Sequence, residues 1–269
     1  MRRKHRKPWA GQGPVEQAEQ HYLVAPRHLA GGGDLRYVTD ALRACGWKDL
    51  ARSGGPLVFD SPDRTVRIGY DPFVQPGGWT IRGKATRQHS AWHASLGRQV
   101  PVEIVAGFTD ALTRPRSAHA PNVWTPLHSQ GWQPERGQHV TATSPDGTAR
   151  LQFHQSGPGD AHWWASARNE HSRTWDALFT ATTPMHLVQA FAGALADPHP
   201  VMRPHGDLPP STQIRTTTVQ VLPSQLSAWQ QARVNAARTA TWTHRPWATA
   251  RPGVTPAARP SASRAGTSR

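Results

Sequence analysis

Two periods of hydrophobic residues run along this chain, and together they predict helices and strands in a fixed order. A stripe at helical spacing follows Asp34, which can cap a helix, and another follows Pro101. Between the two stripes, apolar and polar residues alternate over 65–70, which is the period of a half-buried strand. A Ser-Pro-Asp tripeptide just before that strand favours a tight turn, because Pro presets the backbone and Ser and Asp bond to it. We therefore expect a helix, antiparallel strands and a closing helix.

The same order recurs about 83 positions later. Eight of 24 gapless positions are identical at this offset. They are Trp92, Ala94, Pro101, Val105, Phe108, Ala111, Leu112 and Pro115, matched by Trp175, Ala177, Pro184, Val188, Phe191, Ala194, Leu195 and Pro198. The turn motif recurs as Ser61, Pro62 and Asp63 and then Ser144, Pro145 and Asp146, and a glycine–tryptophan pair recurs as Gly46 and Trp47 and then Gly131 and Trp132. This self-similarity predicts an internal duplication.

The duplication predicts an α+β fold of two tandem repeats, packed pseudo-symmetrically. Each repeat is expected to hold a helix, an antiparallel sheet of three or four strands, and a helix, with the helices on one sheet face. Four parts follow from this: a basic N-terminal tail at 1–19, a first repeat at 20–118, a second at 119–206, and an extension at 207–269. The extension is expected to add one strand and a short helix before a Pro-, Ala- and Arg-rich disordered tail.

The repeated motifs resemble the SPDY-motif domain of streptomycetes. The resemblance rests on the Ser-Pro-Asp turns, the Gly-Trp pairs, the downstream Trp, the helix that Pro begins, and the entry segment Val-Ala-Pro-Arg-His-Leu-Ala at 24–30. It covers roughly 20–205 in two copies, and it departs from the motif at the fourth position, where Arg64 and Gly147 stand in place of Tyr. That position is therefore not expected to be an obligatory functional group. The family is a domain of unknown function (domain of unknown function 317), so the resemblance implies a tandem organisation and no reaction.

Composition narrows the class of protein. No stretch approaches the roughly 18 apolar residues of a membrane helix, and no apolar core follows the basic start. Cys45 is the single cysteine, which excludes an internal disulfide framework and fits a reducing compartment. These features predict a cytoplasmic protein without a membrane partner. Arg outnumbers Lys 27 to 4, which is typical of a high-GC actinobacterial genome.

The net charge of +14 is concentrated at the two ends of the chain. Residues 1–10 carry +5 and residues 211–269 carry +8, whereas the 200 residues between them sum to +1. A folded DNA-binding domain normally carries its own basic face. The charge therefore favours weak, salt-dependent nucleic-acid binding through the tails over a basic groove.

No catalytic, metal or cofactor motif stands out, so neither cofactor nor metal is expected. In the Ser-Pro-Asp turns, the Ser and Asp side chains are expected to bond to the backbone rather than act as a nucleophile and a carboxylate. The fifteen histidines lack the spacing of a zinc site, and the glycines at 31–33 lack the Lys of a phosphate loop. Enzymatic activity is therefore uncertain and not favoured.

The uncovered sheet face is the candidate binding surface. Because neighbouring residues of a strand point to opposite faces, Trp163 and Trp164 are expected to point to opposite sides, with one of them exposed. The candidate residues on the open face are Arg67, Arg82, Lys84, Arg150, Trp164 and Arg168. Such an arginine and aromatic surface suits a peptide, a carbohydrate or single-stranded nucleic acid, although a solvated polar face is the simpler interpretation.

Three functional hypotheses follow. The leading one is a non-enzymatic binding or scaffolding protein with an unknown protein or peptide partner. The second is a nucleic-acid-associated protein that uses its basic tails. The third is a cryptic hydrolase, which requires a cleft that gathers a histidine and a carboxylate.

Overall fold

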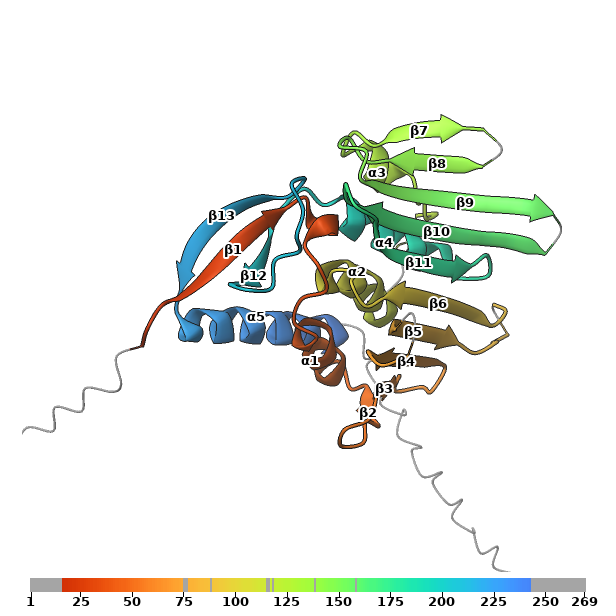
Figure 1. The fold of residues 1–269 in the computed structure, drawn as a ribbon. Coiled ribbons are helices and arrows are strands. Elements are labelled where there is room, and N and C mark those ends of the chain that lie inside the picture. Colours follow the sequence, from red (N-terminus) through yellow and green to blue (C-terminus); the bar gives the residue numbers. More distant parts are fainter. Residues whose placement is uncertain are drawn as a thin grey trace, which may run out of the picture.

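A ten-stranded antiparallel sheet is the central feature of the computed structural model (Figure 1), which describes residues 16–242 except 75, 76, 88, 115, 116, 118, 138 and 158. Its strand order is β2-β3-β4-β5-β6-β11-β10-β9-β8-β7. The first half contains α1 (Arg36–Ala44), β2 (Lys48–Asp49), β3 (Leu57–Asp60), β4 (Val66–Asp71), β5 (Gly78–Gly83), β6 (Trp92–Gly97) and α2 (Val102–Thr113). The second contains α3 (Thr125–His128), β7 (Gln133–Arg136), β8 (Val140–Thr143), β9 (Ala149–Gly157), β10 (Asp160–Arg168), β11 (Arg173–Thr180) and α4 (Met185–Ala196). Each half therefore contributes five consecutive strands.

The two halves meet where β6 pairs with β11. Ser95 lies opposite Leu178, and Ala94 lies opposite Phe179. Ser95 and Leu178 are themselves equivalent positions at the offset of 83, so the register at this junction is the same when read from either half. Pairing the last strand of each half removes two sheet edges that would otherwise expose unpaired backbone groups.

The structure confirms an α+β fold with antiparallel sheets, and it corrects the strand arrangement. We expected a separate sheet of three or four strands in each repeat, but each half has five strands and both halves share one sheet. The fifth strand is the short β2 or β7, which follows the Gly-Trp pair and pairs with β3 or β8. Gly46 and Gly131 have φ of 81° and 75°, which is the left-handed conformation that glycine favours after a helix.

The helices lie on one face of the sheet and leave the other face bare (Figure 1). The core between the helices and the sheet includes both duplicated tryptophan pairs: Trp47 with its counterpart Trp132, and Trp92 with its counterpart Trp175. Across the junction, Phe179 stacks on Phe108 of α2 at a ring-centroid distance of 5.4 Å. α2 and α4 pack so closely that a methyl group on Gly107 would overlap the Cβ of Ala194. One continuous core therefore holds the two halves together.

A second sheet of three strands lies beside the helices, in the order β12-β1-β13. Its strands are β1 (Glu19–Ala25), β12 (Val201–Pro204) and β13 (Arg215–Val221), and the short helix η1 (Arg27–Leu29) follows β1. β1 lies at the start of the first repeat but does not join the ten-stranded sheet. It pairs instead with strands about 180 to 200 positions later in the chain.

The C-terminal extension forms β13 and then the helix α5 (Pro223–Trp242), so it contains both the strand and the helix that were expected there. α5 packs against α1. The guanidinium of Arg233 lies 3.9 Å from the centre of the Tyr37 ring, and it lies 3.0 Å from a carboxylate oxygen of Asp110 in α2.

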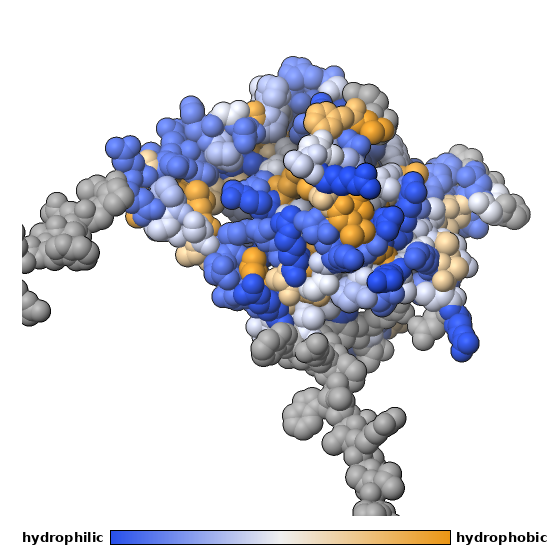
Figure 2. Space-filling view, turned by 90° about the horizontal axis from the view of Figure 1, so that it is seen from below, coloured by the Kyte–Doolittle hydropathy of each residue, from blue (hydrophilic) through white to orange (hydrophobic). Residues whose placement is uncertain are grey.

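From below, the molecule shows small separate groups of hydrophobic residues among hydrophilic ones (Figure 2). The expected disordered tail at the C-terminus and residues 1–15 of the basic N-terminal tail lie outside the described residues. Within the described ranges, no helix combines the length and the apolar character needed to cross a membrane.

Candidate functional site

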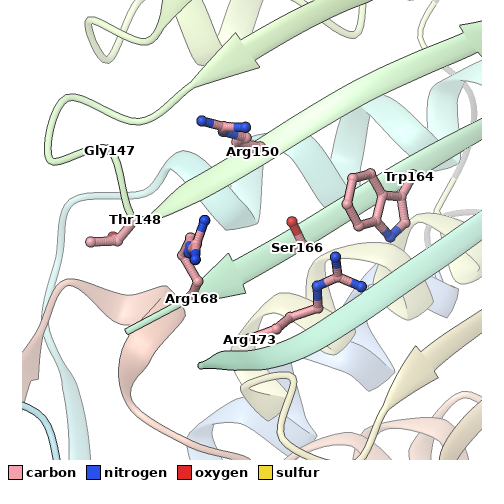
Figure 3. Close-up of a pocket in the computed structure, with 7 residues that line it drawn as sticks. All are labelled: Gly147, Thr148, Arg150, Trp164, Ser166, Arg168 and Arg173. Carbon is pink, nitrogen blue, oxygen red and sulfur yellow. The ribbon is translucent and has the colours of Figure 1, made fainter. Parts of the chain in front are cut away.

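A hollow of about 320 Å³ opens on the bare sheet face of the second half (Figure 3). Its lining comes from the start of β9, from β10, and from the beginning of β11. The lining residues are Gly147, Thr148, Arg150, Trp164, Ser166, Arg168 and Arg173. Three guanidinium groups, the hydroxyl group of Ser166 and one indole ring thus surround a single space, and Gly147 and Thr148 form part of its edge.

Strand alternation explains why these side chains share a face. Trp164, Ser166 and Arg168 are two residues apart along β10, so all three point away from the helices. Arg150 of β9 lies opposite Ser166 in the register. Trp163 points the other way and is buried in the core, where its ring lies 4.7 Å from that of Phe153.

The hollow carries an excess of positive charge. Arg173 lies 3.4 Å from a carboxylate oxygen of Asp176, and the same carboxylate accepts a hydrogen bond of 3.0 Å from the indole Nε1 of Trp164. Arg150 and Arg168 make no ion pair with any carboxylate in the described part of the chain. A single Asp therefore faces three guanidinium groups, and an anion that enters the hollow meets at least two unneutralised cations.

The edge of the hollow is built by the Ser-Pro-Asp turn of the second copy. Thr148 donates a hydrogen bond from its hydroxyl to Asp146 (2.7 Å), and its backbone N–H donates a second (3.0 Å). Ser144 also donates to Asp146, and the Ser144 oxygen accepts the backbone N–H of Ala149 at 2.9 Å. The first copy repeats these contacts with Ser61 and Asp63, as expected from the turn chemistry.

A buried histidine adds to this turn in the second copy alone. The Nε2 atom of His28, which is 5% exposed, lies 2.6 Å from the hydroxyl of Thr148 and 3.6 Å from a carboxylate oxygen of Asp146. Burial by itself would raise the pKa of Asp146, but the neighbouring His28 and hydrogen bonds from Ser144 and Thr148 outweigh it and hold that pKa well below its ordinary value. The turn is therefore a rigid, ionised support for Thr148.

The first half fills the equivalent positions differently. Arg67 corresponds to Arg150, but its Nε and Nη2 atoms donate to the carboxylate of Asp60 at 2.7 and 2.8 Å. At the offset of 83, Thr143 stands where Asp60 would be, directly opposite Arg150. The charge of Arg67 is thus neutralised within its own half, and that of Arg150 is not.

The strand next to Arg67 also differs from its counterpart in β10. The backbone N–H of Lys84 donates to Thr65 as that of Arg168 donates to Thr148, both at 2.8 Å, so Lys84 and Arg168 are equivalent. Counting back along the strands, Arg82 and Thr80 take the places of Ser166 and Trp164. The first half therefore has neither the small residue that forms the floor of the hollow nor its indole wall.

The sequence placed six candidate residues on the open face, and the structure divides them between the halves. Arg150, Trp164 and Arg168 line one hollow, whereas Arg67, Arg82 and Lys84 lie on the first half of the same face. Sequence reasoning missed Gly147, Thr148, Ser166 and Arg173 as lining residues. Ser166 follows the same alternation as Trp164 and was detectable. Arg173 was not, because the register shifts at Ala167 and Arg168 and breaks the alternation.

Three histidines form a row near one end of the bare face. The ring centroids of His139 and His154 are 3.9 Å apart, and those of His154 and His162 are 4.8 Å apart. Among the residues described, no group of three or more His, Cys, Asp or Glu side chains is arranged to hold a metal ion.

Two segments, residues 60–118 and 143–201, match the family model described as "SPDY: Domain of unknown function (DUF317)". The two matches are displaced by 83 positions, the same offset that relates the two halves of the sequence. No curated protein and no solved structure matches the chain. Each match begins at the last residue of β3 or β8 and includes the Ser-Pro-Asp turn, the following strands and the closing helix. The chain therefore carries two tandem copies of the SPDY domain, a domain of unknown function.

Proposed function

We propose that this chain is a non-enzymatic binding protein whose second SPDY copy holds an anionic, phosphate-bearing ligand in the hollow lined by Arg150, Arg168 and Arg173. The observation that carries the proposal is the convergence of three guanidinium groups on one space with a single carboxylate beside them. Guanidinium groups bind phosphate oxygens through paired, charge-assisted hydrogen bonds. Ser166 adds a hydroxyl donor for a further ligand oxygen.

The arrangement of His28 and Thr148 supports binding over hydrolysis. A nucleophilic hydroxyl has to pass its proton to a neighbouring base. The one hydroxyl proton of Thr148 is donated to Asp146, so His28 Nε2 is the donor in its contact with Thr148. The histidine is therefore not placed to activate this hydroxyl, and the cluster serves to position the edge of the hollow.

Calorimetric titration of the full-length chain with inorganic pyrophosphate at about 0.15 M salt tests this proposal. Arg150→Gln and Arg168→Gln should each weaken binding about tenfold, because a hydrogen bond to a charged group contributes roughly 1.5 kcal/mol or more. Arg67→Gln is the matched control, because this arginine occupies the equivalent position and is already paired with Asp60. Equal affinities for all four proteins would remove the hollow as the binding site.

A further inference from the structure

The bare face beside the hollow offers a flat apolar surface as well as charge. In the register, Trp164 lies between Leu178 of β11 and Gln152 of β9. Leu178 is 40% exposed, which is unusual for a leucine in the middle of a sheet. The indole and this leucine thus form a small apolar platform next to the three arginines.

The indole ring of Trp164 is held in place by two contacts. Its Nε1 donates to Asp176, and the guanidinium of Arg173 lies 4.9 Å from the ring centroid. A cation over an aromatic ring is attracted to the negative face of the ring. Since the ring is already oriented, little conformational entropy is lost when a second planar group packs beside it.

Positive charge continues across the junction onto the first half of the face. Arg82 lies on β5 and Lys84 directly follows that strand, four strands away from Arg150 on β9, or roughly 19 Å at the usual strand spacing. Neither Arg82 nor Lys84 makes an ion pair in the described part of the chain. A ligand with one phosphate engages only the hollow, whereas a ligand with several spaced phosphates engages both halves.

We propose that the bare face of the ten-stranded sheet binds single-stranded nucleic acid, with one phosphodiester in the hollow and an unpaired base on Trp164. This inference rests on the function proposed above and names the ligand class. Sequence-tolerant recognition of single strands combines a cationic track with aromatic rings on which bases stack. A duplex keeps its base faces stacked on each other and cannot use Trp164 in this way.

Fluorescence anisotropy with a labelled single strand of about 15 nucleotides tests the inference on the full-length chain. Trp164→Leu should weaken binding of the single strand about tenfold, because the base loses its stacking partner. Binding of a duplex of the same length and of inorganic pyrophosphate should weaken less than binding of the single strand, because neither ligand presents an unpaired base to the ring. Trp229→Leu is the matched control, since Trp229 is an exposed tryptophan on α5, away from the sheet face.

A second variant and a second readout keep the result interpretable. Trp164→Phe retains a stacking ring and should restore most of the single-strand affinity that Trp164→Leu loses. Photocrosslinking to a strand that contains iodouracil should label the peptide that includes Trp164, which separates this face from the basic ends of the chain.

Three outcomes overturn the inference. One is a single-strand affinity that Trp164→Leu leaves unchanged, and another is crosslinking confined to residues 1–15 and 243–269. The third is a doubly phosphorylated peptide that binds through Arg168 when the single strand does not, which would retain the function proposed above and change its ligand. If the full-length chain does not bind pyrophosphate, or binds it equally well after Arg150→Gln and Arg168→Gln, the proposed function itself is overturned.

Discussion

The two Ser-Pro-Asp turns show how a short motif is used at the residue scale. In each, the Ser oxygen accepts the backbone N–H five residues on, and the Asp oxygen accepts that of the Thr two residues on. The fourth position adopts a left-handed backbone in both copies, with φ of 58° at Arg64 and 72° at Gly147. The motif is therefore a structural unit, and what differs between the copies is the neighbour that contacts it.

The contact of His28 with the second turn predicts how folding stability depends on pH. Because the folded-state pKa of Asp146 lies below its unfolded-state value, the ionised carboxylate stabilises the fold above about pH 4 and loses this effect as the pH falls. We expect the free energy of unfolding to fall between about pH 5 and about pH 3, and to fall less steeply in Asp146→Asn. Urea unfolding followed by circular dichroism measures this.

Asp63→Asn is the matched variant in the first turn. The pKa of Asp63 is also lowered: burial acts against this, while hydrogen bonds from Ser61 and Thr65 prevail, but no histidine adds to them. Its substitution should therefore flatten the pH dependence less than Asp146→Asn does. Identical slopes for the two variants would mean that His28 does not add to the effect.

At the scale of elements, one buried arginine joins the three-stranded sheet to the helical layer. Arg203 of β12 pairs with Glu103 of α2 through two bonds of 2.8 and 2.9 Å. It also donates to the carbonyls of Ala30 and Gly31 at 3.0 Å each, and its side chain is 3% exposed. This residue thus fixes the loop before α1 against both neighbouring elements.

Removing that arginine should destabilise the fold strongly. Arg203→Met leaves the mostly buried Glu103 carboxylate unpaired, which costs about 3–5 kcal/mol in comparable buried pairs. The double variant Arg203→Met with Glu103→Leu removes both charges and should regain most of the loss. The exposed pair of Arg36 and Asp34 is the control, because Arg36→Met should cost less than about 1 kcal/mol. If denaturant unfolding gives the double variant the same free energy of unfolding as Arg203→Met, this account is contradicted.

The elements within each copy were predictable from sequence because their signals are local. Alternation located β4 and β9, proline and an apolar stripe located α2 and α4, and glycine located the ends of α1 and α3. The junction of β6 and β11 was not predictable, because outward Ser95 and Leu178 give no sign of the strand they will pair with. The pairing of β1 was not predictable for the same reason, since both of its partner strands lie far along the chain.

The candidate site was predictable only in part. Arg150, Trp164 and Arg168 follow from alternation alone, and the structure places them around one hollow. The sequence does not distinguish Arg67 from Arg150 as a binding residue, because the two occupy the same position in the two copies. The difference lies across the strand pair, where Asp60 faces one and Thr143 faces the other, and it is visible only once the register is known.

At the scale of the whole molecule, this exchange of Asp for Thr predicts which half carries the site. Thr143→Asp should place a carboxylate opposite Arg150, in the arrangement that Asp60 and Arg67 already have, and should weaken pyrophosphate binding about tenfold. Thr143→Asn has the same size without the charge and should leave the affinity within about twofold. The reverse change, Asp60→Thr, should release Arg67 and make the first half more attractive to anions.

Calorimetry with pyrophosphate measures all three variants, and thermal unfolding checks that each is folded. The side chain at position 143 can tolerate the change, because the Thr143 hydroxyl is buried without a hydrogen-bond partner in the described structure and contributes little polar stabilisation. If the hollow is the site, a carboxylate at 143 acts by neutralising Arg150, so Thr143→Asp combined with Arg150→Gln should bind no more weakly than Arg150→Gln alone. Additive losses in that double variant would show that the two positions act independently, and that the register across β8 and β9 does not decide which copy binds the anion.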